Sequence, residues 1–382
     1  MKIGVTKERR PYERRVAASP DSIKRLAGQG HEFLVEAGAG IGSAFPDSAY
    51  EAAGARIAVR ATVFADADIL FKVQRPLGPG EGEVDEMALL KHGGVLVGML
   101  APFQHKDQVA GYAAAGVTAF AMELVPRITR AQTMDVLSSQ ANLAGYKAVI
   151  DAGAQFGRAF PMMMTAAGTV APARALVMGA GVAGLQAIAT ARRLGAIVSA
   201  TDVRLAAKEQ VESLGASFLV VDLEAMKQME TAGGYAKEMG EDFAKRQREH
   251  IAEALKKTDI VITTALIPGR RAPILLTKEM VAGMRPGSVI VDLAVEQGGN
   301  VEGAEFAKHV VTENGVTIIG PANLPSEIAV DASSLYARNL AAFLALLIDK
   351  DKNLVVNLED EIVKAALLTQ GGAVVNPQLA GG

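Results

Sequence analysis

Short apolar runs alternate with amphipathic segments along most of the chain. Before residue 125, five runs have the length and aliphatic content of strands: KIGV at 2–5, HEFLVEAG at 31–38, ADILFKV at 67–73, GGVLVGML at 93–100 and GVTAFAMEL at 116–124. Helical patterns such as SPDSIKRLAGQG at 19–30 separate these runs. Strands that alternate with helices predict a βαβ domain with a parallel sheet.

A second series with the same rhythm follows. Its strand-like runs are RALVMGAG at 174–181, AIVSATDV at 196–203, SFLVVD at 217–222, DIVITTA at 259–265, SVIVDLA at 288–294 and TIIG at 317–320. The fold class predicted is therefore α/β, with two Rossmann-like, doubly wound parallel-sheet domains in tandem.

Two longer helical patterns connect the segments of the chain. The first covers 134–156 without a proline, and the second covers 329–347. If the second helix returns the chain to the first domain, that domain is discontinuous. We predict an N-terminal α/β domain of residues 1–133 and 328–382 and a nucleotide-binding domain of residues 134–327 that includes the connecting helix.

Composition removes several classes of function. The chain has 382 residues, half of them hydrophobic, and a formal net charge of −3 with mixed signs, which argues against nucleic acid as a partner. Cysteine is absent, so disulfides, thiolate metal ligands and a cysteine nucleophile are excluded, and we expect no metal in the site. A reducing compartment suits such a chain.

No segment is expected to enter a membrane. The longest apolar run, LAAFLALLI at 340–348, is about half of the roughly 20 residues that span a bilayer. The amino terminus, MKIGVTKERR, lacks the apolar stretch and cleavage site of a signal peptide. We expect a cytoplasmic protein.

A glycine signature opens the second series. Gly179, Gly181 and Gly184 form a GxGxxG pattern between a strand and a helix, and Asp202 ends the next strand. The first glycine permits a tight turn, the second lets backbone approach a pyrophosphate, and the third lets helix and strand pack closely. This setting predicts a dinucleotide site, with the adjoining Val182 and Val203 included in it.

Asp202 favours NAD(H), because a carboxylate accepts hydrogen bonds from ribose hydroxyls and repels a 2′-phosphate. Arg204 keeps NADP(H) open, since its side chain either contacts a phosphate or is solvated. Thr264 and Leu266 follow the next core strand, where backbone can border the nucleotide. Between 223 and 259 a long crossover carries two glycines before Tyr235, which is either a lid over the nucleotide or a surface insertion.

The stretch RITRAQTMDVLSSQ at 127–140 is unusually polar for the start of an apolar helix. On a continuous helix Gln132, Asp135, Ser138 and Asn142 would form a stripe on one face. Capping by Thr133 or Gln132 accounts for one or two polar residues. A polar stripe of about three turns must face a polar surrounding, which is a ligand, a second domain or solvent.

Several motifs together resemble one family. KERRPYERRVAASP, GAGIGSAFPDSAYEAAGA, FKVQRP, the glycine signature, ATDVR and VDLAVEQGGN are similar to the family that unites alanine dehydrogenases with the NAD(H)-binding domain I of proton-translocating transhydrogenases. The likeness covers almost the whole chain. It implies two Rossmann-like domains joined by long helices, with NAD(H) in the interdomain cleft.

The two branches of this family need different chemistry. Oxidative deamination of an amino acid requires a proton carrier at the reacting carbon, whereas hydride exchange between nicotinamides requires aligned rings. The resemblance places Met99 where alanine dehydrogenases carry a catalytic histidine, and Glu296 where they carry an aspartate. Arg15 and Lys72 match the positions that hold the substrate in alanine dehydrogenases, which keeps an amino-acid site conceivable.

None of the five histidines is an obvious replacement. His105 is nearest to Met99 along the sequence, and its polar surroundings predict a surface side chain.

By the same resemblance, four residues position the nicotinamide: Arg127, Gln132, Asp135 and Ser138. The implied protein is a peripheral NAD(H)-binding subunit that passes hydride from NADH to NADP⁺ on a partner. Its implied partners are an NADP(H)-binding component, transmembrane subunits that move protons, and a second copy in a homodimer. The alternatives are an alanine dehydrogenase or related amino-acid dehydrogenase, and a non-catalytic NAD(H)-sensing subunit.

Overall fold

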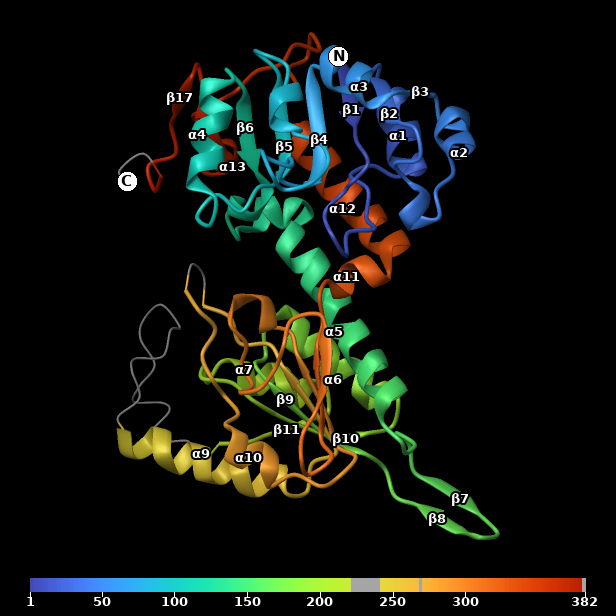
Figure 1. The fold of residues 1–382 in the computed structure, drawn as a ribbon, viewed down its shortest axis with the longest axis vertical. Helices are drawn as coiled ribbons and strands as arrows, with labels where there is room; N and C mark the ends of the chain where they lie inside the picture. Colours follow the sequence, from blue (N-terminus) through green and yellow to red (C-terminus); the bar gives the residue numbers. More distant parts are fainter. Residues whose placement is uncertain (221–240, 268–269, 380–382) are drawn as a thin grey trace. The chain divides into compact units, whose positions relative to one another are not determined.

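The computed structural model describes residues 1–220, 241–267 and 270–379. These residues form two compact units. Unit 1 comprises residues 1–140 and 325–382, and unit 2 comprises residues 141–324. Each unit is built around its own sheet (Figure 1).

Unit 1 contains an eight-stranded sheet in the order β17-β16-β6-β5-β4-β1-β2-β3. Its strands are β1 Lys2–Val5, β2 Glu32–Glu36, β3 Ala55–Ala58, β4 Ile69–Gln74, β5 Val95–Met99, β6 Thr118–Ala121, β16 Leu367–Gln370 and β17 Ala373–Val374. The six strands from β3 to β6 are parallel to their neighbours, whereas β16 pairs antiparallel with β6 and β17 with β16. The last two strands come from the C-terminal region of the chain, about 250 residues after β6 in the pairing of Ala119 with Thr369.

Helices cover both faces of the first sheet because alternate strand residues point to opposite sides. Phe33 and Phe71 belong to the buried cluster that includes Tyr336 of α12, while Leu34 and Leu70 belong to the cluster on the other face. The helices of this unit are α1 Pro20–Ala27, α2 Asp47–Ala52, α3 Arg60–Asp66, α4 Lys106–Ala114, α12 Ala329–Leu344 and α13 Glu361–Ala366.

Unit 2 contains a seven-stranded sheet in the order β11-β10-β9-β12-β13-β15-β14. Its strands are β9 Arg174–Met178, β10 Ile197–Thr201, β11 Ser217–Phe218, β12 Ile260–Thr263, β13 Val289–Asp292, β14 Lys308–Val311 and β15 Thr317–Gly320. Among these described strands, only β14 runs antiparallel to its neighbour. The chain therefore winds from β9 outward to β11 and then crosses to β12 on the other side of β9, which makes the β9/β12 position a topological switch point.

The described helices of unit 2 include α6 Val182–Arg193, α7 Ala207–Ser213, α9 Glu241–Leu255 and α10 Lys278–Ala282. Helix α5 Val136–Gln155 starts in unit 1 and continues in unit 2, whereas α11 Leu324–Glu327 starts at the last residue of unit 2 and lies mainly in unit 1. Ala187 and Ile188 of α6 pack with Val177 on one face of the sheet, and Leu255 of α9 packs with Leu176 on the other. A separate hairpin of β7 Met163–Thr165 and β8 Gly168–Val170 projects from the body of this unit (Figure 1).

The predicted α/β class with two mostly parallel sheets is confirmed, and all eleven strand-like runs contain a strand. Three strands, β14, β16 and β17, pair antiparallel with their neighbours, so both sheets are mixed but mostly parallel. The sequence patterns also missed β3, the β7–β8 hairpin, β14, β16 and β17.

Both predicted long helices are present. The first is α5, Val136–Gln155, and the unit boundary at residue 140 falls within it; the second is α12. The expectation that Gln132 shares the long helix is wrong: it lies in the short 3₁₀ helix η4, Thr129–Met134, which ends before α5 starts. Gln132 and Ser138 are therefore not on one continuous helical stripe.

Helix α5 approaches α6 through a glycine. A Cβ on Gly145 would lie 2.0 Å from the carbonyl oxygen of Ala183 in α6, far inside van der Waals contact, and the obstacle is backbone. We expect Gly145→Ala to destabilise the protein by about 1–3 kcal/mol through overpacking, although alanine is the better helix former.

Thermal unfolding of the full chain measures this effect. Gly157→Ala is the matched control, because a Cβ there meets no heavy atom within 4 Å. Equal melting temperatures for the two variants would contradict the close approach of α5 and α6.

Candidate functional site

The turn between β9 and α6 carries the glycine signature. Gly179 has φ of +104°, a conformation that L side chains rarely adopt, and a Cβ there would lie 2.5 Å from Thr264 Oγ1. A Cβ on Gly184 would lie 1.8 Å from the carbonyl oxygen of Gly179, so helix and turn pack without space for a side chain. A Cβ on Gly181 would meet nothing within 4 Å, which leaves the space over the helix start open.

The start of α6 is available to an anion. Gly181 is its N-cap and Val182 its first residue, and no side chain caps the helix. Unbonded amides and the helix dipole give such a terminus partial positive charge. An open glycine at the head of a 12-residue helix fits a pyrophosphate.

Thr264 holds the neighbouring strand end against this turn. Its backbone amide donates to the carbonyl of Met178 at 2.9 Å, and its hydroxyl donates to the carbonyl of Gly179 at 3.1 Å. Leu266 lies two residues further on and is 47% exposed. The two predicted residues thus flank the switch point of the sheet from the β12 side.

Asp202 stands at the end of β10, and its side chain is only 6% exposed. Its Oδ2 accepts the amide of Ala180 in the glycine turn at 2.7 Å, so the acid and the turn are joined directly. The side chain of Arg204 also binds both carboxylate oxygens, at 2.9 Å each. Burial favours the neutral acid, but these hydrogen bonds hold the pKa of Asp202 below its usual value. Val203 between them is 55% exposed.

These features together fit a bound dinucleotide. The open Gly181 position, the uncapped helix start and an ionised carboxylate at the end of β10 suit a pyrophosphate and a ribose. Tyr235 and the glycines before it lie outside the described residues.

Two residues that sequence reasoning missed fix the loop after β12. Asn300 is fully buried; its Oδ1 accepts the amide of Ala265 at 3.0 Å and its Nδ2 donates to the Ala265 carbonyl at 2.9 Å. Asp292, also fully buried, accepts the backbone amide of Asn300 at 2.7 Å. Both belong to the motif VDLAVEQGGN, where a buried acid followed by Gly-Gly-Asn was the available signal.

In unit 1 the four predicted nicotinamide residues lie around the junction of η4 and α5. Arg127 and Gln132 are exposed. Asp135 precedes α5 and caps it: its carboxylate accepts the amide of Ser138 at 2.8 Å and the Ser138 hydroxyl at 2.6 Å. The cap is therefore Asp135, and the expectation that Thr133 or Gln132 provides it is wrong.

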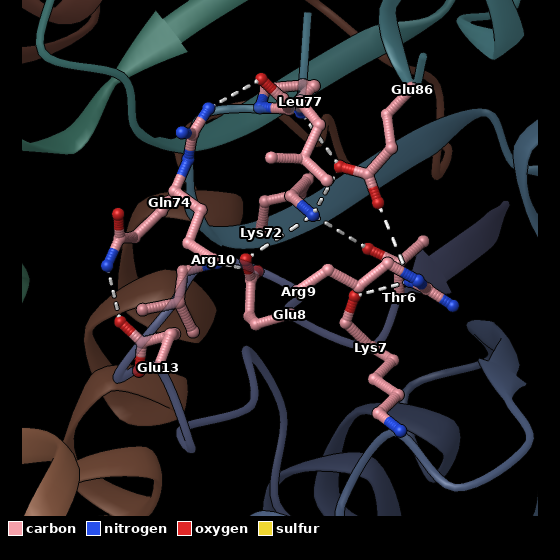
Figure 2. A network of polar contacts seen from close by, with 12 residues as sticks. Thr6, Lys7, Glu8, Arg9, Arg10, Glu13, Lys72, Gln74, Leu77 and Glu86 are labelled. Carbon is pink, nitrogen blue, oxygen red and sulfur yellow. Dashed lines mark hydrogen bonds and ion pairs between the residues drawn. The ribbon is translucent and has the colours of Figure 1, made fainter. Parts of the chain in front are cut away.

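Unit 1 has a switch point of its own between β1 and β4, and a buried charge cluster fills it (Figure 2). Lys72 of β4 is 1% exposed, and its Nζ lies 3.1 Å from Glu86 Oε2 and 3.4 Å from Glu8 Oε2. It also donates to the hydroxyl of Thr6 at 3.3 Å. The ammonium group is thus satisfied by the chain itself.

Arg15 is neutralised in the same way. Its guanidinium binds both carboxylate oxygens of Glu13, at 2.8 and 2.7 Å, and donates to Gln140 at 2.8 Å. Burial acts to raise the pKa of Glu13, but the charge and hydrogen bonds of Arg15 outweigh it and bring that pKa to about 2. Gln74 adds a further hydrogen bond to Glu13 at 2.6 Å (Figure 2).

Glu8 is the carboxylate of this cluster whose ionised form is disfavoured. Burial raises its pKa to about 7, and the nearby carboxylates of Glu13 and Glu86 act in the same direction against the attraction of Lys72. Its Oε1 accepts the amide of Val73 at 2.7 Å, which favours the ionised form.

Comparison with known proteins identifies the family. The family model "Alanine dehydrogenase/PNT, N-terminal domain" matches residues 4–144, and "Alanine dehydrogenase/PNT, C-terminal domain" matches residues 148–377. The chain belongs to the alanine dehydrogenase/PNT family.

Within this family the chain is similar to transhydrogenase components. It is 59% identical over 383 residues to a Rhodospirillum rubrum protein named as the first portion of the alpha subunit of NAD(P) transhydrogenase, covering 100% of this chain and 99% of that protein. The crystal structure of transhydrogenase from Sinorhizobium meliloti has a TM-score of 0.88 at 53% identity, covering 98% of this chain and 100% of that one. Alanine dehydrogenase of Bacillus subtilis is 31% identical over 393 residues, covering 100% of this chain and 94% of that protein.

From its sequence the chain was expected to differ from alanine dehydrogenases at Met99 and Glu296, and the structure shows the surroundings of both. Met99 ends β5 opposite Gln74 of β4 and is partly buried against the core. Glu296 lies exposed in the short helix η5, Val295–Gln297. His105 precedes α4 and is partly exposed; burial and the charge of Arg75 lower its pKa.

Among the described residues, no helix combines the length and apolar character needed to span a bilayer. The same residues contain no cluster of histidine and acidic side chains suited to a metal ion.

The buried Glu8 predicts a pH effect on stability. Its pKa is about 7 in the folded protein and 4.5 for the unperturbed group, so the folded chain binds the extra proton between these values. The contribution of Glu8 to the free energy of unfolding is therefore largest below pH 4.5 and falls as pH rises to about 7. Relative to the wild type, Glu8→Gln should gain about 2–3 kcal/mol between pH 4.5 and 8.

Chemical denaturation at several pH values measures this difference. Glu32→Gln, an exposed position on β2, is the control and should follow the wild-type curve. A constant difference between Glu8→Gln and wild type across this pH range would contradict the raised pKa.

Proposed function

We propose that this chain is the NAD(H)-binding component of a proton-translocating transhydrogenase and passes hydride from NADH to NADP⁺ on a partner subunit. The observation that carries the proposal is the full-length match, at 59% identity, to a protein named as the first portion of an NAD(P) transhydrogenase alpha subunit. The dinucleotide features of unit 2 support it.

In this proposal, unit 2 holds the adenosine and pyrophosphate of NAD(H). The amides at the start of α6, at Gly181 and Val182, face the pyrophosphate, and Asp202 accepts from the ribose. Val203, Thr264 and Leu266 border the nucleotide. The bonds of Asn300 to Ala265 hold the loop that carries Thr264 and Leu266 in place. Tyr235 remains a predicted contact of the same nucleotide.

Arg127, Gln132, Asp135 and Ser138 position the nicotinamide. Asp135 and Ser138 are already bound to each other at the head of α5, so their orientation is set before any ligand binds. The exposed Arg127 and Gln132 offer a guanidinium and an amide beside them. Such donors and acceptors suit a carboxamide and a ribose, and none of them has to exchange a proton.

The reaction itself balances without an acid or base on this chain. When bound, the dinucleotide supplies the hydride: NADH and NADP⁺ give NAD⁺ and NADPH, and one hydride moves from ring to ring. Met99 stands where an amino-acid dehydrogenase needs a proton carrier. The protein contributes alignment and exclusion of water, while transmembrane partner subunits move protons. The chain would thus act at the cytoplasmic face of the membrane, held there by its partners.

An amino-acid dehydrogenase is the second candidate, and Arg15 and Lys72 are the residues that favour it. Both are buried and paired with the chain's own carboxylates. A substrate carboxylate would have to displace Glu13 or Glu86, and breaking a buried pair costs about 3–5 kcal/mol. A non-catalytic NAD(H) sensor is the third candidate.

We also propose that two copies of the chain form a homodimer through the β7–β8 hairpin. Met162, Met163 and Met164 are 59, 43 and 77% exposed, and the hairpin pairs with neither large sheet. A two-stranded hairpin with adjacent exposed apolar residues is marginal in water, and a second copy would bury them.

Direct hydride exchange tests the proposed function. The purified chain, mixed with the NADP(H)-binding component of a transhydrogenase, should oxidise NADH and reduce thionicotinamide-NADP⁺. Gln132→Asn should slow the exchange at least about tenfold, because a small misplacement of the ring is costly, while the Kd for NADH changes little. Gln29→Asn, an exposed amide on the loop after α1, is the matched control.

Two results would overturn the proposal. NADH formation from NAD⁺ and L-alanine by the chain alone would favour the dehydrogenase. No exchange in a complex that demonstrably forms would favour the sensor.

Analytical ultracentrifugation tests the homodimer. Replacing Met162 and Met164 with Gln should weaken self-association at least about tenfold, since each buried methionine contributes about 1.5–3 kcal/mol. Val311→Gln is the control, an apolar residue of the same unit that is 67% exposed on β14. Unchanged association in the double variant would place the interface elsewhere.

A further inference from the structure

Unit 2 has a cavity of about 260 Å³ at the amino ends of β12 and β13. Asp259, which precedes β12, and Ser288, which precedes β13, line it together with Arg158 and Arg285. The glycine turn follows the carboxyl end of β9, and β9 runs parallel to β12. The cavity and the candidate dinucleotide site therefore lie at opposite edges of the same sheet.

A tight turn fixes the backbone that carries Arg285. In the turn of residues 285–288, the amide of Ser288 donates to the carbonyl of Arg285 at 3.1 Å, and Gly287 has φ of +81°. Proline at the second position and glycine at the third are typical of a type II turn. The amide of Gly287 also donates to the carbonyl of Gly315 at 2.8 Å, which ties the turn to the body of the unit.

The guanidinium of Arg285 is exposed and has no ion pair or hydrogen bond within the part of the chain that the structure describes. Its N–H groups all remain available to an anion, and a guanidinium stays protonated at every physiological pH. The fixed turn therefore presents an uncompensated positive charge at the wall of the cavity.

Arg158 brings a second guanidinium to the cavity from the segment after α5. Its Nη1 lies 3.4 Å from Oδ1 of Asp259, longer than the roughly 2.7–2.9 Å of a strong charge-assisted hydrogen bond. The guanidinium also lies 5.9 Å from the centroid of the Phe156 ring, where the ring face favours a cation. These contacts orient Arg158 and leave most of its N–H donors available.

The lining carries a net charge of +1, because two guanidiniums face a single carboxylate. That carboxylate is already engaged: Oδ2 of Asp259 accepts the amide of Arg174 at 2.8 Å, and the residue is only 5% exposed. An anion that enters the cavity thus meets two positive groups at the surface and one negative group that is turned to the chain.

We propose that this cavity binds a small organic oxyanion, a carboxylate or a phosphate monoester, through Arg158 and Arg285. The planar fork of a guanidinium binds either group. The volume is close to the roughly 300 Å³ at which small-molecule pockets begin, which favours a compact metabolite over a dinucleotide. The site is additional to the proposed hydride transfer and does not depend on it.

A second copy of the chain is another possible occupant, because Arg158 lies shortly before the β7–β8 hairpin. The exposed apolar residues of that hairpin are methionines, which offer no negative charge to the two guanidiniums. The charge of the lining therefore favours the small anion. A simpler explanation is that both arginines are solvated surface charges, and a binding measurement separates these alternatives.

The experiment uses the full-length chain as wild type, Arg158→Met, Arg285→Met and the double variant. Phenyl phosphate, benzoate and the uncharged benzyl alcohol are titrated into each protein by calorimetry, at low and high salt. Thermal melts check that every variant is folded. Arg25→Met, an exposed arginine on α1 of unit 1, is the matched control for loss of one surface charge.

Wild type should bind phenyl phosphate or benzoate with a Kd of about 1 mM or lower, and benzyl alcohol at least about tenfold more weakly. Each single variant should lower the oxyanion affinity at least about tenfold, as expected for loss of hydrogen bonds to a charged group. The affinity should fall with salt, and Arg25→Met should bind as wild type does. No oxyanion binding by wild type, or equal binding by wild type and the double variant, would overturn the inference.

Two further measurements place the site. NADH affinity should be the same in wild type and in the double variant, because the cavity lies at the opposite edge of the sheet from the glycine turn. Sedimentation should show unchanged self-association in the double variant; its loss would overturn the ligand site in favour of an interface between copies. A wild type that binds an oxyanion but no NADH would contradict the proposed function and support the site.

Discussion

The candidate dinucleotide site of unit 2 depends on the absence of a side chain at residue 184. Helix α6 comes so close to the turn after β9 that even a methyl group would overlap the carbonyl of Gly179. Because the helix starts that close, its amides and the end of β10 border the same small region. Asp202 accepts the amide of Ala180 from the β10 side of this region, and the hydroxyl of Thr264 donates to the carbonyl of Gly179 from the β12 side. The arrangement leaves open space over Gly181, at the head of the helix.

The other unit has the same winding order and treats its switch point in the opposite way. Where unit 2 has open space at Gly181, unit 1 fills the ends of β1 and β4 with Lys72, Glu8 and Glu86 (Figure 2). Burying these charges is tolerable only because each has a partner. The two units thus share a winding order but differ at the switch point: unit 1 fills it with its own charged side chains, whereas in unit 2 the position of Gly181 beside it stays open.

Local patterns predicted the features of the fold whose causes are local. The strands of both sheets are continuous apolar runs, and the glycine turn with its acid lies within about thirty residues, the length of a βαβ unit. Strands β16 and β17 were missed because the sheet receives them through β6, about 250 residues earlier in the chain. Strand β7 was missed because a run of methionines is not β-branched.

Within the candidate site, it was easier to predict which residues are present than how their side chains are oriented. The sequence places Arg204 two residues from Asp202, but whether the guanidinium turns to solvent or to the acid depends on the backbone after β10. Likewise, Asp135 was interpreted as a member of a helical face, whereas the helix starts one residue later and turns it into a cap. A shift of a few residues in one helix boundary changes which side chains share a face. The bonds of Asn300 to Ala265 involve contacts across 35 residues, which no local pattern contains.

The way Asn300 holds the loop after β12 has a consequence for which sequences this loop tolerates. Its amide binds the N–H and the C=O of Ala265, so it recognises backbone, as a neighbouring strand would, and ignores the side chain. The path of the loop is therefore encoded at residue 300, outside the loop itself. The side chains of residues 265–267 are therefore not needed to fix this backbone. Substitutions there can change the surface that the loop presents without changing its conformation.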